Sequence, residues 1–217
     1  GGEPSRVMTY YSYNVGDVHF VSLDSYGKDD VNTTKMYDTL GAQATWLKKD
    51  LAANTKKWTV VYFHHPPYTK TSHNSDDEQD LAAIRENFIQ ILERYGVDLV
   101  LCGHAHAYER SYLLKGFYRN FADQLKDADF NAALHTATGN TQTGNYNGTL
   151  DSCAYAYNSG KYAHGSIYVV SGSAGKLDGV KAAGYPQDCM AYSNVDNGGC
   201  FYFEVDSNRL DAKFVSY

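Results

Sequence analysis

Two apolar runs, each ending in histidine, constrain the fold of this chain more than any other feature. The first run covers residues 57–63 and leads into His64, and the second covers 97–102 and leads into His104. Between them, residues 77–95 place apolar side chains at helical spacing along one face. Near-continuous apolar strands joined through a helix are typical of a parallel sheet that is covered on both faces. The sequence therefore predicts a βαβ unit with both histidine clusters at the carboxyl edge of the sheet.

The histidines at these strand ends form a candidate metal site. His64 is followed by His65, and His104 and His106 stand in a Gly-His-x-His turn. Side chains at i and i+2 of an extended segment point to the same side, and imidazole is a common ligand of transition metals. A lone histidine at a strand end is more often a hydrogen-bonded rim residue, but three in two such clusters favour metal binding. We predict His64, His104 and His106 as metal ligands.

The remaining patterns extend the α/β unit along the chain. Nothing in residues 1–217 marks a linker or a repeat, so we predict a single domain with residues 111–165 as a long insert. Periodicity and turn residues predict these further elements: strands at 17–24 and 166–171, helices at 43–53 and near 118–134, and a closing antiparallel pair at 199–205 and 212–215.

Charge and hydropathy exclude two classes of partner. The chain has 19 basic and 25 acidic residues, a net charge of −6, and no basic stripe, which argues against nucleic acid as the main partner. No apolar run reaches the roughly 18 residues that a membrane span needs. An anionic substrate would therefore depend on local positive charge from cations and histidines.

The cysteines and two short patterns favour an exported protein. Cys189 and Cys200 flank a turn rich in glycine and asparagine and could pair, with Cys153 left over or bonded to one of them. Asn-x-Thr acceptor patterns for glycosylation occur at 32–34 and 147–149. Disulfides suit an oxidising compartment. These observations predict a secreted or periplasmic location.

Four stretches carry a resemblance to a known family: residues 16–25, 64–68, 103–110 and 167–172. The third, Gly-His-Ala-His-Ala-Tyr-Glu-Arg, is the most specific of them. With these stretches the chain resembles the C-terminal half to two-thirds of calcineurin-like metallophosphoesterases, and most closely their purple-acid-phosphatase branch. The resemblance implies a four-layer α/β/β/α sandwich, with two sheets packed face to face between helices and a two-metal centre at the strand ends.

The resemblance also implies roles for individual histidines. His64 and His104 fall on ligands of one ion, and His106 falls on a ligand of the other. His73 falls on a position that contacts the substrate phosphate or protonates the leaving group. His65 lies beside a ligand, and we group it with His73 as a candidate catalytic residue. The implied cofactors are two divalent or trivalent metal ions, with iron paired with zinc or manganese.

Other residues near these motifs receive structural interpretations. Residues 108–110, Tyr-Glu-Arg, are expected to fix the ligand loop through hydrogen bonds and an ion pair. His19, His135 and His164 belong to no partner pattern, and we interpret them as structural or surface residues.

The chain departs from the family upstream of His64. The family takes its other ligands from an Asp-x-His, a Gly-Asp and a Gly-Asn-His motif, and none of these precedes His64 in this chain. The sequence therefore resembles a domain that lacks its N-terminal third and, with it, the bridging carboxylate. Because two close cations repel strongly without an anionic bridge, we predict that this chain alone binds at most one transition metal and is weakly active or inactive. An N-terminal segment would complete the site.

The predicted function is metal-dependent hydrolysis of small phosphate monoesters, with this chain supplying the histidine half of a two-metal centre. One alternative is a phosphodiesterase or nucleotide hydrolase built on the same centre. Another is a non-catalytic, exported binding module that has lost the centre. The sequence upstream of residue 1 would discriminate between the enzymes and the module.

Overall fold

The computed structural model describes residues 2–26, 35–118, 125–145 and 164–217. Its elements follow one another along the chain in this order: β1 (Tyr11–Val15), β2 (Val18–Ser22), α1 (Ala42–Ala53), β3 (Trp58–Tyr62), α2 (Gln79–Ala83), η1 (Ile84–Phe88), α3 (Ile89–Arg94), β4 (Leu99–Cys102), β5 (Tyr108–Ser111), η2 (Asp127–Asp129), α4 (Ala132–His135), β6 (Ile167–Ser171), β7 (Met190–Asn194), β8 (Gly199–Asp206) and β9 (Arg209–Ser216).

The main sheet has seven strands in the order β1-β2-β3-β4-β6-β5-β7. Its centre is parallel, because β2, β3, β4 and β6 all run in the same direction. The edges are antiparallel, with β1 against β2 on one side and β5 against β6 and β7 on the other. The carboxyl ends of β3 and β4 therefore lie side by side, which brings the two histidine clusters together.

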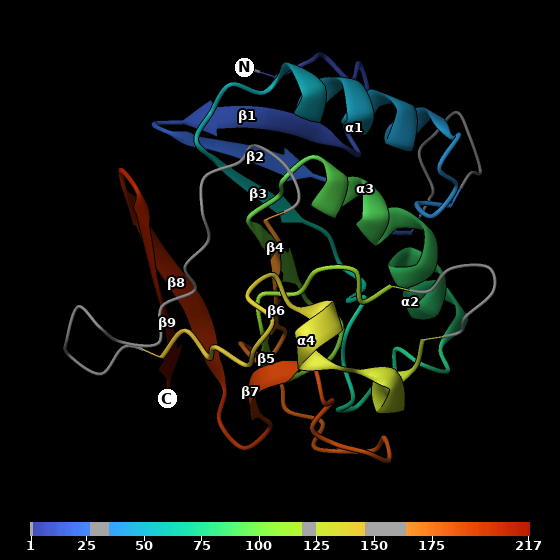
Figure 1. Cartoon of the computed structure of the whole chain (residues 1–217), viewed down its shortest axis with the longest axis vertical. Coiled ribbons are helices and arrows are strands. Elements are labelled where there is room, and N and C mark those ends of the chain that lie inside the picture. The colour runs from blue at the N-terminus through green and yellow to red at the C-terminus, as the bar shows by residue number, and fades with distance from the viewer. Residues whose placement is uncertain (1, 27–34, 119–124, 146–163) are drawn as a thin grey trace.

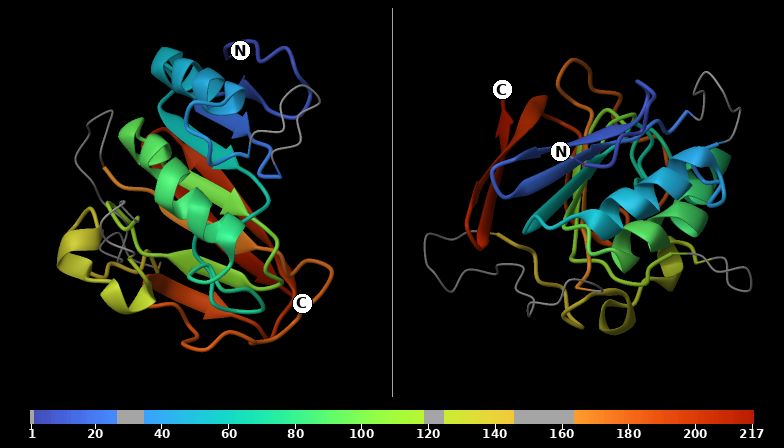
Figure 2. Two further views of the ribbon diagram at one scale, coloured as in Figure 1. Left: turned by 90° about the vertical axis from the view of Figure 1, so that its right-hand side faces the viewer. Right: turned by 90° about the horizontal axis from the view of Figure 1, so that it is seen from above.

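Helices cover one face of this sheet, and a separate hairpin covers the other (Figures 1 and 2). Helix α1 and the continuous helix α2–η1–α3 pack on one side, and the antiparallel pair β8–β9 lies on the opposite side. The middle turn of the long helix, η1, is wound as a π-helix. A single π turn inside an α-helix is frequent near functional sites.

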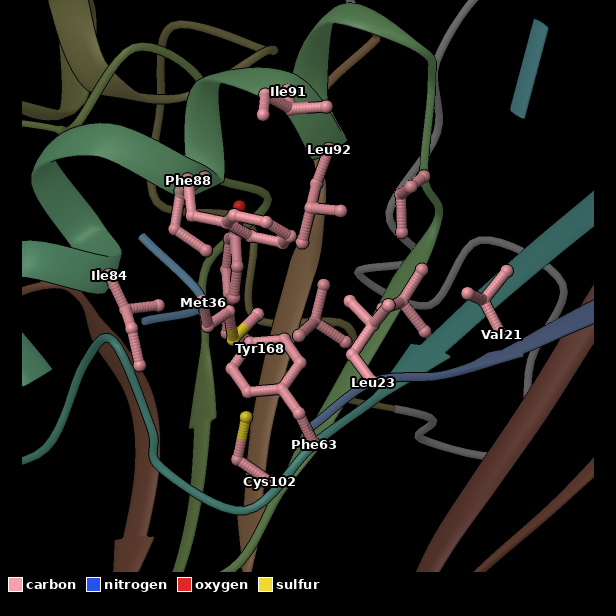
Figure 3. Close-up of a cluster of buried hydrophobic side chains, with 14 of the residues drawn as sticks. Val21, Leu23, Met36, Phe63, Ile84, Phe88, Ile91, Leu92, Cys102 and Tyr168 are labelled. Carbon is pink, nitrogen blue, oxygen red and sulfur yellow. The ribbon is translucent and has the colours of Figure 1, made fainter. Parts of the chain in front are cut away.

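Alternation along the central strands divides the core into two layers. Val61, Val100 and Tyr168 face the helices, whereas their neighbours Val60 and Leu99 face the hairpin. This is the period of two that a pleated strand imposes. Figure 3 shows the helix-side core, where residues of the strands meet those of the long helix. Burial on both faces accounts for the near-continuous apolar runs in the sequence.

The predicted α/β fold class is confirmed, and two sheets pack against each other as expected. The predicted strands at 17–24, 57–63, 97–102 and 166–171 and the closing pair correspond to β2, β3, β4, β6 and β8–β9. The predicted helices at 43–53 and 77–95 are α1 and α2–η1–α3. Among the described residues, no helix packs on the outer face of β8–β9, so three of the four expected layers are present.

The prediction of one helix near 118–134 is wrong for the described part of that range. Only the short turns η2 and α4 are helical there, and residues 119–124 lie outside the described residues. The chain instead turns inward at Asp127, whose carboxylate lies 3.0 Å from the Nζ of Lys70. This buried ion pair holds Asp127 in a short 3₁₀ turn instead of a regular α-helix.

The pairing of Cys189 with Cys200, one of the possibilities that the sequence left open, does not form. Both are free thiols, because Cys189 is buried completely in the helix-side core while Cys200 is exposed on β8. Cys153 and the two acceptor patterns at 32–34 and 147–149 lie, in whole or in part, outside the described residues. In the described part of the chain, every helix is too short or too polar to cross a bilayer.

Candidate metal centre

The site begins where β3 and β4 end. Backbone hydrogen bonds continue the pairing of these strands beyond their last residues, from the Phe63 amide to the Leu101 carbonyl and from the Gly103 amide to the His64 carbonyl, both at 3.1 Å. His104 follows at once with a positive φ of 64°, a conformation that is uncommon outside glycine and is often found at functional sites. The paired strand ends thus place His64 and His104 next to each other.

Three imidazoles converge at this edge of the sheet. The Nε2 of His64 lies 3.1 Å from the Nδ1 of His104, and the His65 ring lies 5.0 Å from the His64 ring and 4.7 Å from the His104 ring, centroid to centroid. One nitrogen from each of the three lies within 4.8 Å of the others. Three nitrogen donors at this spacing suit a transition-metal cation.

Two contacts with Ser25 fix the position of His65. The Ser25 hydroxyl lies 2.9 Å from the Nδ1 of His65 and accepts a hydrogen bond of 3.1 Å from the His65 amide. Tyr26 stacks against His64 at 5.4 Å and meets the edge of His65 at 4.6 Å. These contacts place His65 in the group of three imidazoles that could hold a metal ion.

Burial, together with the neighbouring histidines, favours the neutral form of these imidazoles. Burial lowers the pKa of His64 and His65, and the nearby histidines lower it further. Burial, followed by the proximity of His73, His65 and His64, lowers the pKa of His104 to about 4. A neutral imidazole keeps a free lone pair for a cation, so these side chains are ready to bind metal at neutral pH.

His73 lies against the same cluster, on the loop after β3. Its ring stacks on that of His104 with the centroids 3.9 Å apart. Its Nδ1 lies 2.9 Å and 3.1 Å from the two carboxylate oxygens of Glu78, which also accepts a 2.7 Å hydrogen bond from the Asn74 amide. His73, Glu78 and His104 form a second group of three donors within 4.8 Å of one another.

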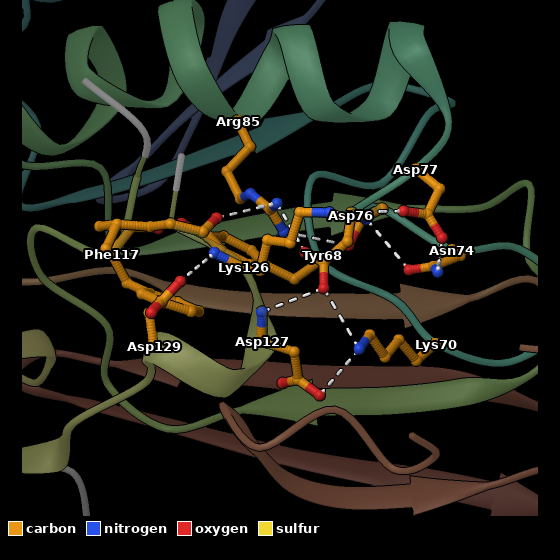
Figure 4. Close-up of polar contacts among 12 residues, drawn as sticks. Tyr68, Lys70, Asn74, Asp76, Asp77, Arg85, Phe117, Lys126, Asp127 and Asp129 are labelled. Carbon is orange, nitrogen blue, oxygen red and sulfur yellow. Dashed lines mark hydrogen bonds and ion pairs between the residues drawn. The ribbon is translucent and has the colours of Figure 1, made fainter. Parts of the chain in front are cut away.

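A buried ion network holds the loop that carries His73 (Figure 4). Asp76 lies 2.7 Å from the guanidinium of Arg85 and 3.2 Å from the Nζ of Lys70, and Lys70 lies 3.0 Å from Asp127. Arg85 stands in the π turn η1 and is only 3% exposed. The π turn therefore directs the buried guanidinium of Arg85 towards Asp76 on this loop. This ion pair holds the loop and, with it, the position of His73.

His106 lies apart from the three converging rings. Its Nδ1 lies 2.5 Å from the Oδ2 of Asp178, and it belongs to neither group of three donors among the described residues. It remains near enough to His64 to lower the pKa of that side chain. Of the three ligands predicted from the sequence, the structure brings His64 and His104 into contact and gives His106 a carboxylate partner instead.

Residues 108–110 link the ligand loop to its neighbours through hydrogen bonds, as predicted. Glu109 is fully buried on β5, where it accepts a short hydrogen bond from the Thr69 hydroxyl, and burial raises its pKa to about 7. Arg110 donates to the Thr143 carbonyl and, at 3.0 Å, to the Asn145 side chain.

Four residues that contact these histidines were not predicted from the sequence: Ser25, Tyr26, Glu78 and Asp178. Glu78 is five residues from His73, and Asp178 is 72 residues from His106. Neither spacing belongs to a metal-binding motif. The sequence signal nearest to Asp178 is the Gly-rich stretch that follows β6, and it does not single out this carboxylate.

The donor set fits one cation better than two. His64, His65 and His104 supply three neutral nitrogens, which suit an ion such as Zn²⁺. His106 and Asp178 supply one nitrogen and one carboxylate, fewer than the three protein ligands typical of a catalytic zinc site. Among the residues that the structure describes, the only carboxylate in a three-donor group is Glu78, and it is already paired with His73.

Comparisons with known proteins give the same assignment as the motifs. A family model described as calcineurin-like phosphoesterase matches residues 4–108. Purple acid phosphatase 15 of Arabidopsis thaliana is 40% identical over 111 residues, which cover 49% of this chain and 19% of that protein. Purple acid phosphatase 22 of the same plant is 38% identical over 118 residues, which cover 52% and 24%. The resemblance to calcineurin-like phosphoesterases, and to purple acid phosphatases among them, is confirmed.

Solved structures support the fold. The purple acid phosphatase PPD1 from yellow lupin seeds superposes with a TM-score of 0.56 at 18% identity, covering 86% of this chain and 26% of that one. The Plasmodium protein GAP50, described as the anchor in the inner membrane complex, gives 0.52 at 16% identity over 95% and 49%. The matched part of the chain spans 19% and 24% of the two plant relatives, so similarity alone does not assign their activity to it.

Proposed function

We propose that this chain carries the histidine half of a metal-dependent phosphoester hydrolase centre that acts on small phosphate monoesters. The observation that carries the proposal is the convergence of His64, His65 and His104 at the ends of β3 and β4, with His73 stacked beside them. Partial desolvation of a polar imidazole costs free energy. Holding several neutral imidazoles close to one point is therefore unfavourable unless they bind a cation there.

Each side chain has a definite task in this proposal. His64, His104 and His65 hold the first cation, and His106 serves the second, as the family resemblance implies. Bound cations supply positive charge that offsets the charge of the phosphoryl group and acidifies water. Iron with zinc or manganese is the pair that the resemblance predicts, and a secreted or periplasmic location suits the predicted substrate class.

His73 is the proposed proton donor. Because Glu78 accepts the proton on its Nδ1, the Nε2 is the atom left to face a substrate. A carboxylate at this position orients the imidazole, as the aspartate of a catalytic triad does. His73 would therefore protonate the leaving group or donate to a phosphate oxygen.

Zn²⁺ binding tests the proposal directly. Isothermal titration of the metal-free chain of residues 1–217 is expected to give at most one bound Zn²⁺, and His104→Ala should abolish measurable binding. His135→Ala is the matched control, because His135 lies on α4 and contacts the backbone of Asn131 rather than the site. Two tightly held equivalents, or unchanged binding by His104→Ala, would contradict the proposal.

Activity provides the second test. In the full-length protein, hydrolysis of an aryl phosphate should disappear with His104→Ala and fall less with His73→Ala. A phosphodiesterase would instead prefer a bis-aryl phosphate diester. A full-length protein that binds Zn²⁺ at this site but hydrolyses neither ester would favour the non-catalytic module.

A further inference from the structure

We infer that Asp178 is the positioning residue for His106: its carboxylate holds the proton on Nδ1 and so presents Nε2 to a cation. The inference rests on the proposed function and deepens it, because it names a residue that prepares the metal centre without being one of the predicted ligands. Nothing in the motif around His106 points to Asp178, which is supplied by the segment between β6 and β7.

The contact is close and directional. The Oδ2 of Asp178 lies 2.5 Å from the Nδ1 of His106, within the range of a charge-assisted hydrogen bond. A carboxylate only accepts hydrogen bonds, so the Nδ1 must carry the proton. In a neutral imidazole the lone pair then resides on Nε2, which is the form that a metal ligand requires.

The two oxygens of Asp178 have different partners. Oδ1 lies 2.8 Å from the Nζ of Lys176, while Oδ2 faces His106. The Asp178 side chain is 17% exposed although its lysine partner is 64% exposed, so the carboxylate is turned inward and the lysine outward. Lys176 thus contacts one carboxylate oxygen without competing for the oxygen that contacts His106.

The backbone around the contact is also fixed. An added Cβ on Gly172, the residue after β6, would lie 2.2 Å from the Ala105 carbonyl oxygen, so the β6 end packs directly on the turn between His104 and His106. The segment that begins there supplies Asp178, whose carboxylate contacts His106 in the same turn.

A simple surface ion pair is the competing interpretation. Such pairs contribute little and would leave a nearby metal site unchanged when removed. A carboxylate that orients a metal-binding histidine behaves differently, because its loss typically reduces metal affinity about 10- to 100-fold. The two interpretations therefore predict different metal affinities for the same variants.

Zn²⁺ titration of five variants of the full-length protein, followed at the second bound ion, which His106 is proposed to hold, discriminates them. Asp178→Ala should weaken Zn²⁺ binding about 10-fold or more. Asp178→Asn, which keeps an oxygen that can accept from Nδ1, should retain part of that affinity. Lys176→Met should cause no loss, because it removes only the partner of the other oxygen. In the background of His106→Ala, adding Asp178→Ala should have no further effect, since the two residues act through one contact.

Each result bears on the inference. Unchanged affinity in Asp178→Ala, an Asp178→Asn variant as weak as Asp178→Ala, or full additivity with His106→Ala would overturn it. Thermal unfolding of each metal-free variant shows whether a loss of affinity reflects loss of the fold. If the unaltered full-length protein binds no Zn²⁺, the proposed function fails, whereas two bound ions whose affinities do not change in Asp178→Ala overturn this inference alone.

Discussion

Glu93, on the last turn of α3, should make the stability of this protein fall as pH rises. Its carboxyl group is 6% exposed and accepts one hydrogen bond of 2.8 Å, from the Gly116 amide, to its Oε2. The buried Oε1 has no hydrogen-bond partner within the described part of the chain. Burial without full hydrogen bonding penalises the charged form and raises the pKa of Glu93 from 4.5 to about 7.

The sign and size of the effect follow from this shift. Between the two pKa values the folded protein binds more protons than the unfolded chain, so stability decreases as pH rises and levels off above about 7. One pKa unit corresponds to about 1.4 kcal/mol, so the whole shift corresponds to roughly 3 kcal/mol. Of this, about 2.5 kcal/mol is lost between about pH 5 and about pH 8.

Glu93→Gln tests this prediction, because glutamine keeps an acceptor for the Gly116 amide and never ionises. Urea unfolding followed by tryptophan fluorescence should show the variant gaining about 2 kcal/mol on the unaltered protein between about pH 5 and about pH 8. Glu204→Gln, at an exposed position on β8, is the control and should show no such gain. A difference between Glu93→Gln and the unaltered protein that is the same at both pH values would refute the reasoning.

Two further substitutions test what holds the site and its scaffold. Asp50→Asn breaks a buried contact of 2.8 Å with His19 and should cost about 3–5 kcal/mol in urea unfolding near neutral pH. Burial alone raises the pKa of Asp50, but hydrogen bonds from His19 and Ser12 outweigh burial and lower the pKa. The cost of Asp50→Asn should therefore shrink as pH falls through the folded-state pKa of Asp50. A cost that does not change with pH would contradict the assignment. Gly172→Ala should displace the 103–107 turn, costing about 1–3 kcal/mol and weakening Zn²⁺ binding, whereas Gly175→Ala, whose added Cβ meets no atom within 4 Å, should do neither.

The parts of the fold that the sequence predicted are those in which local pattern and tertiary burial agree. Strands β3 and β4 are covered on both faces, so their apolar runs are visible without any structure. Strand β5 was missed because its residues, Tyr-Glu-Arg-Ser, include a glutamate whose burial depends on the distant Thr69. Strands β1 and β7 lie at the sheet edges, where weak patterning is tolerated.

The same distinction applies to the site. His64 and His104 were predictable because each follows an apolar strand, and parallel neighbours in a sheet end at the same edge. The position of His65 was not, because a residue adjacent to a ligand normally points away in an extended chain, and only its contacts with Ser25 and Tyr26 hold it in the cluster. Whether residues 1–217 form a single domain with 111–165 as an insert stays a prediction.

The carboxylates at the site change the electrostatic argument for a two-metal centre. Three neutral imidazoles offer no negative charge, so the sequence alone predicted that two close cations would repel too strongly to bind. Glu78 and Asp178 each place a carboxylate against a histidine of the site, within 2.9 Å and 2.5 Å respectively. Neither bridges the cluster, but their charge lowers the repulsion on either side of it. We therefore expect a completed two-metal centre to need a bridging carboxylate and further ligands for the second cation from elsewhere, while Glu78 and Asp178 supply negative charge beside it.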